Sequence, residues 1–153
     1  MEINALEIGV ILIVLAAAPI LYIIFSTNAS HTKVKNRFTA LCSANGVHLT
    51  NYEAIGSAIL GLDASLNKLV YSSASDIENR FQVVPLSEVK HCEVKTAQSN
   101  KKYLEFVELE LIGNAFKNDI VVYEEQDESV STDPNMCLYE LKKWEKLIKQ
   151  QLS

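Results

Sequence analysis

The chain has 153 residues, with 14 Lys and Arg against 19 Asp and Glu, and a formal net charge of −5. This length suffices for one domain of ordinary size around a single core. A mildly acidic chain without a clustered basic excess lacks the pattern of a nucleic-acid-binding protein, so we expect no nucleic-acid partner.

The first predicted element is an apolar run of 18 residues, IGVILIVLAAAPILYIIF, at positions 8–25. As a helix it rises roughly 27 Å, close to the hydrocarbon thickness of a bilayer of about 30 Å. A cleaved signal typically has a basic n-region and a shorter run, whereas Glu2 and Glu7 precede this one. We predict a retained anchor over residues 1–26; a cleaved signal and a buried core helix are the alternatives. The predicted membrane-spanning residues include Ile8, Val14, Pro19 and Phe25.

The basic residues predict the orientation of this anchor. All 14 Lys and Arg follow Phe25, starting with Lys33, Lys35 and Arg37. Short cytoplasmic flanks of membrane helices carry such an excess. We therefore predict a single-pass protein of the cell (inner) membrane, with its N-terminus outside and its C-terminal domain in the cytoplasm. The alternative places the domain outside, as a subunit of an envelope complex.

Residues 27–54 are predicted to form a juxtamembrane helix and a connector. Val34, Phe38 and Cys42 recur at helical spacing, and Asn45-Gly46 is a typical helix stop. Lys33 and Arg37, four residues apart, share a helix face and are candidate contacts to anionic lipid headgroups, at about 1 kcal/mol each. The alternative is that they only set the topology from a solvated face.

Residues 55–153 are predicted to form a β domain closed by a helix. AILGLDASLNKLVYSS is typical of a hairpin, FQVVPLSEVKHCEVKTA of two strands broken near Pro85, and KYLEFVELELIG with DIVVYEE of a second hairpin. Asp133 and Pro134 then form a predicted helix start. The predicted helix has an apolar face of Cys137, Leu141, Trp144 and Ile148 and a basic face of Lys142, Lys143, Lys146 and Lys149.

These elements together resemble the pleckstrin-homology-like (PH-like) domains of bacterial membrane proteins. The residues that carry the resemblance are AILGLDASLNKLVY, VVPLSEVKHCEV, LEFVELELIG with NDIVVYEE, and the helix around Trp144. The resemblance implies a curved sheet or split barrel plugged by the helix, and a binding or scaffolding role. Phosphoinositide-binding members have a basic cluster in the first hairpin loop. In this chain the loop is DASLN, and its one charged residue is Asp63.

Catalytic motifs are missing from the sequence. None of its five glycines forms a phosphate-binding pattern, and it contains no Gly-x-Ser-x-Gly and no His-Glu-x-x-His. The three cysteines are widely spaced, so we expect buried thiols rather than a metal site or disulfides. His31, His48 and His91 are expected to have surface or core positions without a catalytic role. We expect no cofactor, no metal and no small-molecule substrate.

The one dense set of chemical groups is acidic. Glu108 and Glu110 share a predicted strand face, and Glu125 is positioned to oppose them. A membrane-tethered hydrolase would need these carboxylates to converge in one cleft. The alternative is a charged, exposed sheet face that discourages edge association.

The sequence thus predicts an α+β chain with an N-terminal transmembrane helix, a juxtamembrane helix, and an antiparallel sheet or split barrel with a C-terminal helix. We expect a membrane-anchored, non-enzymatic interaction or scaffolding protein that binds a protein partner or itself. The hydrolase and the envelope-complex subunit remain the alternatives.

Overall fold

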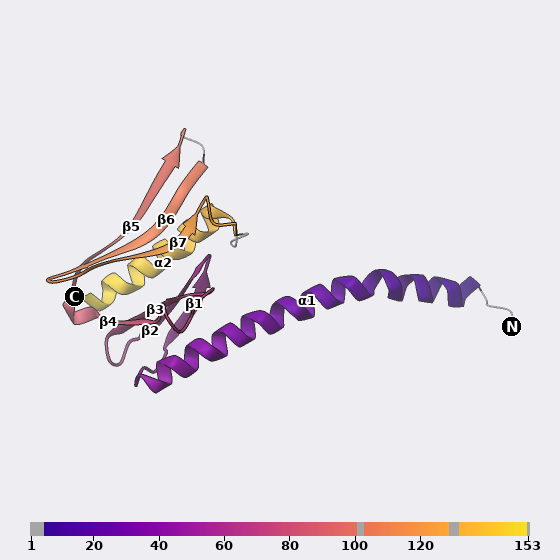
Figure 1. Cartoon of the computed structure of the whole chain (residues 1–153), viewed down its shortest axis with the longest axis horizontal. Coiled ribbons are helices and arrows are strands. Elements are labelled where there is room, and N and C mark those ends of the chain that lie inside the picture. Colours follow the sequence, from indigo (N-terminus) through magenta and orange to yellow (C-terminus); the bar gives the residue numbers. More distant parts are fainter. Residues whose placement is uncertain (1–4, 101–102, 129–131, 153) are drawn as a thin grey trace. The chain divides into compact units, whose positions relative to one another are not determined.

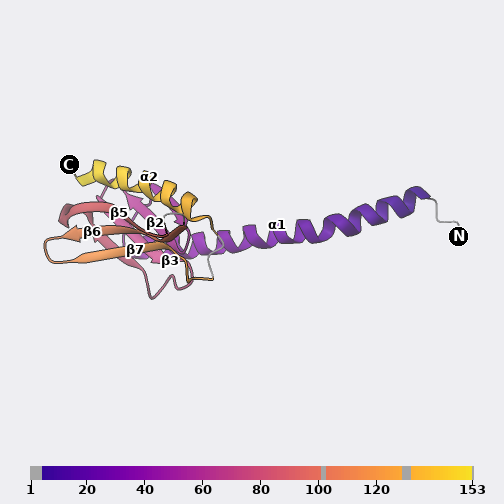
Figure 2. The ribbon, with the colours of Figure 1, turned by 90° about the horizontal axis from the view of Figure 1, so that it is seen from above.

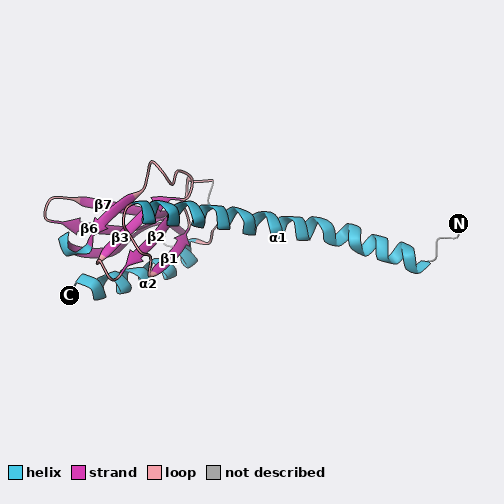
Figure 3. Ribbon diagram, turned by 90° about the horizontal axis from the view of Figure 1, so that it is seen from below, coloured by secondary structure: helices cyan, strands magenta, loops and turns pink. Residues whose placement is uncertain are grey.

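The computed structural model describes residues 5–100, 103–128 and 132–152, and the chain forms two compact units. The first unit runs from Met1 to Arg37 and the second from Phe38 to Ser153. α1 (Ala5–Ala44) begins in the first unit and ends in the second. Figure 3 distinguishes the helices from the strands.

The second unit contains two antiparallel sheets and a C-terminal helix (Figure 1). One sheet has the strand order β1-β2-β3-β4, and the other has the order β5-β6-β7. The elements that follow α1 are β1 (Asn51–Ile55), β2 (Ala58–Asp63), β3 (Lys68–Ser73), β4 (Gln82–Pro85), the 3-10 helix η1 (Leu86–Glu88), β5 (Val89–Ser99), β6 (Tyr103–Gly113), β7 (Lys117–Glu124) and α2 (Pro134–Leu152).

Two local sequence features determine where one sheet ends and how the two sheets are connected by a hydrogen bond. Pro85 ends β4, because proline has no N–H to donate to a ladder, and η1 then leads into β5. In the β1–β2 turn, Gly56 has φ +55° and a Cβ there would lie 1.9 Å from the Val122 carbonyl oxygen. The next residue, Ser57, donates its N–H to that same oxygen over 2.9 Å. The turn of one sheet is therefore hydrogen-bonded to β7 of the other.

The main core lies between the two sheets and α2. β6 alternates as its sequence predicts: Val107, Leu109 and Leu111 are fully buried, while Glu108 and Glu110 lie on the opposite face. α2 packs along β5 and β6 and also reaches β1 and η1 (Figures 1 and 2). The four α2 residues predicted to be apolar-face residues are all buried: Cys137, Leu141, Trp144 and Ile148.

The end of α1 covers the second face of the four-stranded sheet. Phe38 and Cys42 are fully buried, and the Phe38 ring lies 5.8 Å from those of Tyr52 and Phe81. Gly46, at φ +69°, and Val47 donate their N–H groups to the carbonyls of Ser43 and Cys42, which is a Schellman motif. All residues of β2 are buried because both of its faces are covered.

Several sequence predictions are confirmed. The Asn45-Gly46 helix stop, the β2–β3 and β6–β7 hairpins and the break at Pro85 are all present. The Asn135 N–H donates to Asp133 Oδ1 over 2.9 Å, which confirms the predicted cap of α2. The fold is α+β with two antiparallel sheets, which do not form a closed barrel.

Two predictions need correction. The juxtamembrane helix expected as a separate element is the last part of α1, since residues 26–44 contain no Gly or Pro that would interrupt a helix. Residues 51–54, expected in a connector, belong to β1. The short run NYEAI has little alternation of its own, and its pairing with β2 makes it a strand.

Candidate functional site

The apolar run lies within α1, and most of its residues are exposed. Exposed fractions are 48% for Ile8, 61% for Val14 and 70% for Phe25, and Pro19 is also exposed inside the helix. An 18-residue window has a mean hydropathy of 2.9, and none of it is buried within the chain. This helix is long and apolar enough to cross a membrane. Its exposure disagrees with the buried-core alternative, because soluble proteins rarely expose apolar patches above a few hundred Å².

Lys33 and Arg37 lie after this run in the same helix. Both side chains are exposed, and their spacing of four residues places them on one helix face. Contact with lipid headgroups stays a prediction for both.

A second candidate region is the outer face of the sheet β5–β7, which carries charges on all three strands. Residues directly opposite each other in an antiparallel pair share a face. The register places Glu93 opposite Glu110 and Lys95 opposite Glu108, and Asp119 on β7 lies opposite Glu110. This face therefore holds a continuous network of acidic and basic side chains.

Most side chains of this network form ion pairs with one another. The Lys95 ammonium lies 2.7 Å from Glu93, and the Lys117 ammonium lies 2.8 Å from Glu110 and 3.5 Å from Asp119. The hydrogen bond from Lys95, followed by that with His91, lowers the pKa of Glu93, and the hydrogen bond from Lys117 lowers the pKa of Glu110. Both carboxylates are therefore held ionised at neutral pH.

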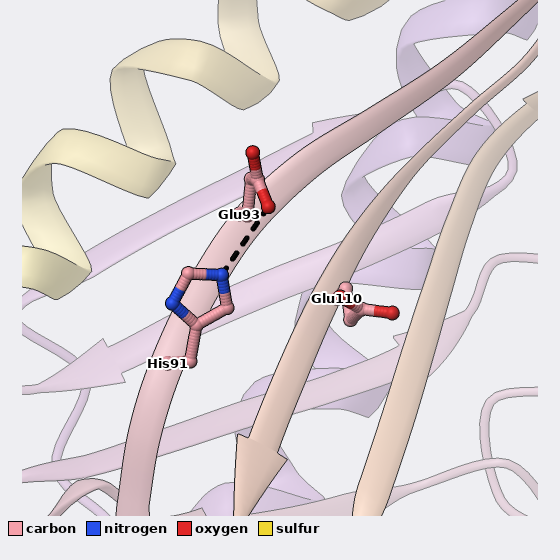
Figure 4. A group of neighbouring side chains, drawn as sticks. All are labelled: His91, Glu93 and Glu110. Carbon is pink, nitrogen blue, oxygen red and sulfur yellow. Dashed lines mark hydrogen bonds and ion pairs between the residues drawn. The ribbon is translucent and has the colours of Figure 1, made fainter.

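One end of this network brings together three side chains with metal-ligand chemistry. His91 Nε2 lies 3.2 Å from Glu93 Oε2 on the same strand, and Glu110 lies on the adjacent strand (Figure 4). One nitrogen or oxygen atom from each of the three residues lies within 4.8 Å of the other two. The sequence predicts a surface or core position for His91 and does not single out Glu93; only the strand register brings Glu110 beside them.

The carboxylates that the hydrolase alternative needs do not converge. Glu108 lies opposite Val121, whereas the Glu125 N–H donates to the Glu105 carbonyl, three residues further along β6. Three strand residues span about 10 Å. Burial, followed by the charge of Asp119, raises the pKa of Glu108, while the pKa of Glu110 is lowered. Glu108, Glu110 and Glu125 thus form no common cleft.

A third candidate region is a groove between β1 and α2. It has a volume of about 470 Å³, and its lining includes Tyr52 and Glu53 from β1 and Lys143, Trp144 and Lys146 from α2. The Trp144 Nε1–H donates to Glu53 Oε2 over 2.6 Å, and Lys143 lies 3.4 Å from Glu53 Oε1. Glu53 thereby joins the edge strand to the helix and gives the groove a polar base.

The first hairpin loop has a structural arrangement around Asp63. Its Oδ1 accepts hydrogen bonds from the Ser65 N–H, the Ser65 hydroxyl and the Leu66 N–H, and its Oδ2 accepts one from the His48 N–H. Asp63 is fully buried, and these bonds, that from the Ser65 hydroxyl first, lower its pKa to about 2. The Asp63 carboxylate thus accepts hydrogen bonds within the turn through both of its oxygens.

The three cysteines are free and buried, as expected. Burial raises the pKa of Cys42 to about 11 and that of Cys92 to about 12, and it also raises the pKa of Cys137. Only the thiolate is a strong nucleophile, so these groups are poorly suited to nucleophilic chemistry at neutral pH. His91 is exposed while its neighbour Cys92 is buried, so the two point to opposite faces of β5.

Comparison with known proteins does not extend this description: no protein-family model, no curated protein and no solved structure matches the chain.

Proposed function

We propose that this chain is a single-pass membrane protein that displays a non-catalytic, PH-like interaction domain in the cytoplasm, where it binds a protein partner or a second copy of itself. The observation that carries the proposal is the exposed apolar helix at positions 8–25, which precedes a domain with its own core. Exposed apolar side chains of this kind are unfavourable in water and favourable in a lipid bilayer. The domain, by contrast, buries its apolar residues in its own core.

The arrangement of the domain supports the PH-like part of the proposal. Two antiparallel sheets enclose a core against which one C-terminal amphipathic helix packs, as the resemblance implies. Domains of that family usually present a surface to lipids or proteins. The buried, hydrogen-bonded Asp63 in the first hairpin loop favours a protein over a phosphoinositide as the partner.

The β1–α2 groove is the surface that we assign to the partner. It combines β1, the edge strand of the four-stranded sheet, with exposed Lys146 and half-buried Leu147 on α2. Main-chain pairing at a sheet edge and side-chain contacts to a helix are a common basis of peptide recognition.

Reporter fusions test the topology. A fluorescent protein that folds in the cytoplasm, fused after Ser153, is expected to fluoresce, and alkaline phosphatase at the same position is expected to be inactive. Active phosphatase would place the domain outside and support the envelope-complex alternative.

Site-specific photocrosslinking in intact membranes tests the interaction surface. A photoreactive amino acid in place of Lys146, within the groove, is expected to give a discrete adduct with a partner or with a second copy. The control position is Asn79, which is exposed in the loop between β3 and β4. Equal adducts from both positions, or none from Lys146, would contradict the assignment of the groove.

A further inference from the structure

The side chains of His91, Glu93 and Glu110 form a mixed donor set on the outer face of β5 and β6. An imidazole nitrogen with two carboxylates suits zinc and other first-row divalent cations. Glu93 and Glu110 are direct partners in the ladder, and His91 directly follows a register shift between Val89 and His91. His91 stands two residues before Glu93 and therefore on the same face.

The distances between the donor atoms are near those that a metal requires. Zinc bonds of 2.0–2.2 Å in tetrahedral geometry place two ligand atoms about 3.4 Å apart. His91 Nε2 and Glu93 Oε2 are 3.2 Å apart, and the full set lies within 4.8 Å. In Figure 4 the Glu110 side chain extends toward the third strand, so it must rotate to complete the site. The side chains of His91 and Glu93 are 52% and 44% exposed and have room to adjust. That of Glu110 is 13% exposed, and its rotation has to break the ion pair with Lys117.

The charge on this face favours a cation. Around the donor set the face carries four carboxylates and two ammonium groups, so a formal excess of two negative charges remains there at neutral pH. The carboxylates are Glu93, Glu108, Glu110 and Asp119, and the ammonium groups are Lys95 and Lys117. Lys117 already lies 3.5 Å from Asp119 and retains that partner if it leaves Glu110.

We propose that His91, Glu93 and Glu110 bind one divalent transition-metal cation, with zinc as the best match, and that the cation ties β5 to β6. Water completes the coordination, because the site is open to solvent. Lys95 and Lys117 compete with the metal for the carboxylates, so the affinity is lower than that of a closed structural zinc site. The proposal does not depend on the proposed function, since it concerns a face of the sheet away from the β1–α2 groove.

Calorimetric titration of the full chain in detergent micelles with zinc chloride, without a histidine tag, tests the site. We expect saturable binding of one zinc per chain at pH 7.5. His91→Ala and Glu110→Gln are each expected to weaken binding at least tenfold. His48→Ala, at an exposed histidine outside the site, is the matched control and is expected to bind as the unmodified chain does.

A variant that is expected to bind zinc more tightly provides a second test. Lys95→Met removes the ammonium that lies 2.7 Å from Glu93 and is expected to tighten zinc binding several-fold. Circular dichroism of each variant checks that the fold is retained. The proposal is wrong if the unmodified chain shows no saturable binding, if His91→Ala binds as tightly, or if Lys95→Met leaves the affinity unchanged or weaker.

Discussion

The apolar part of α1 and the helix α2 have the same backbone structure but opposite relations to their surroundings. Positions 8–25 are apolar around the whole helix, and none of them is buried within the chain. α2 concentrates its apolar residues on one stripe, which is buried, and bears lysines on the other side. The arrangement of apolar residues around a helix, more than their number, thus indicates which solvent it needs.

The two helices also differ in what their polar groups do. The apolar run contains no charged side chain. In α2, by contrast, Glu145 Oε2 accepts a hydrogen bond from the Val94 N–H on β5 over 3.1 Å, and Trp144 donates to Glu53. These bonds fix α2 against the edges of both sheets. A helix that packs on a sheet needs directional contacts, whereas a membrane-spanning helix needs the absence of polar groups.

Charge within the apolar run should produce the largest effect. We expect Leu12→Arg combined with Leu15→Arg to oppose membrane insertion by about 5–7 kcal/mol, because each arginine at the centre of a span costs about 2.5–3.5 kcal/mol. The chain should then move from the membrane pellet to the soluble or aggregated fraction after alkaline extraction.

The matched control carries the same two charges outside the run. Ser30→Arg with Asn36→Arg places them on exposed positions of the polar part of α1. This variant is expected to remain in the membrane pellet. Release of both variants, or retention of both, would contradict the assignment of positions 8–25 as the span.

Truncation of Trp144 tests the buried stripe of α2 and should have the second-largest effect. Trp144 is 2% exposed, and we expect Trp144→Ala to lower the free energy of unfolding by about 3–5 kcal/mol. Trp144→Phe removes mainly the hydrogen bond to Glu53, at about 1–3 kcal/mol. Urea unfolding of the full chain in micelles, followed by circular dichroism, measures both values.

Tyr139 provides the control on the same helix. It is 67% exposed, so Tyr139→Ala should change the free energy of unfolding by no more than about 0.5 kcal/mol. A loss comparable to that of Trp144→Ala would show that the exposed side of α2 is covered by something in solution.

A smaller effect at neutral pH than that of Trp144→Ala is expected for Asp63→Asn, which keeps the shape of the side chain and one acceptor oxygen. Because the pKa of Asp63 is lowered to about 2, its ionised form stabilises the fold above pH 4, and this contribution is lost as the pH falls from about 4 to about 2. The urea midpoint of the unmodified chain should therefore fall across this range, and that of Asp63→Asn should fall less. Parallel pH profiles would contradict the role of the carboxylate.

Much of the fold could be predicted from local patterns. The apolar run, the β6 alternation and the stripe of α2 each follow from the spacing of apolar residues over a few turns or strand residues. β1 could not be predicted, because its stability comes from β2 and not from its own sequence. The continuity of α1 could not be predicted, because the polarity of the chain changes near residue 26 while the helix continues without a break.

The sequence by itself therefore determined most of the elements and an apolar helix suited to a membrane, because helix and strand periodicities and helix caps act over short stretches of chain. Only the tertiary structure decided which side chains meet. Glu53 and Trp144 are 91 residues apart in the chain and share a hydrogen bond, and Glu93 meets Glu110 through the β5–β6 register. A shift of that register by one residue would move every side chain of the strand to the other face. The donor set on this sheet is thus a property of strand pairing, which depends on contacts throughout the domain.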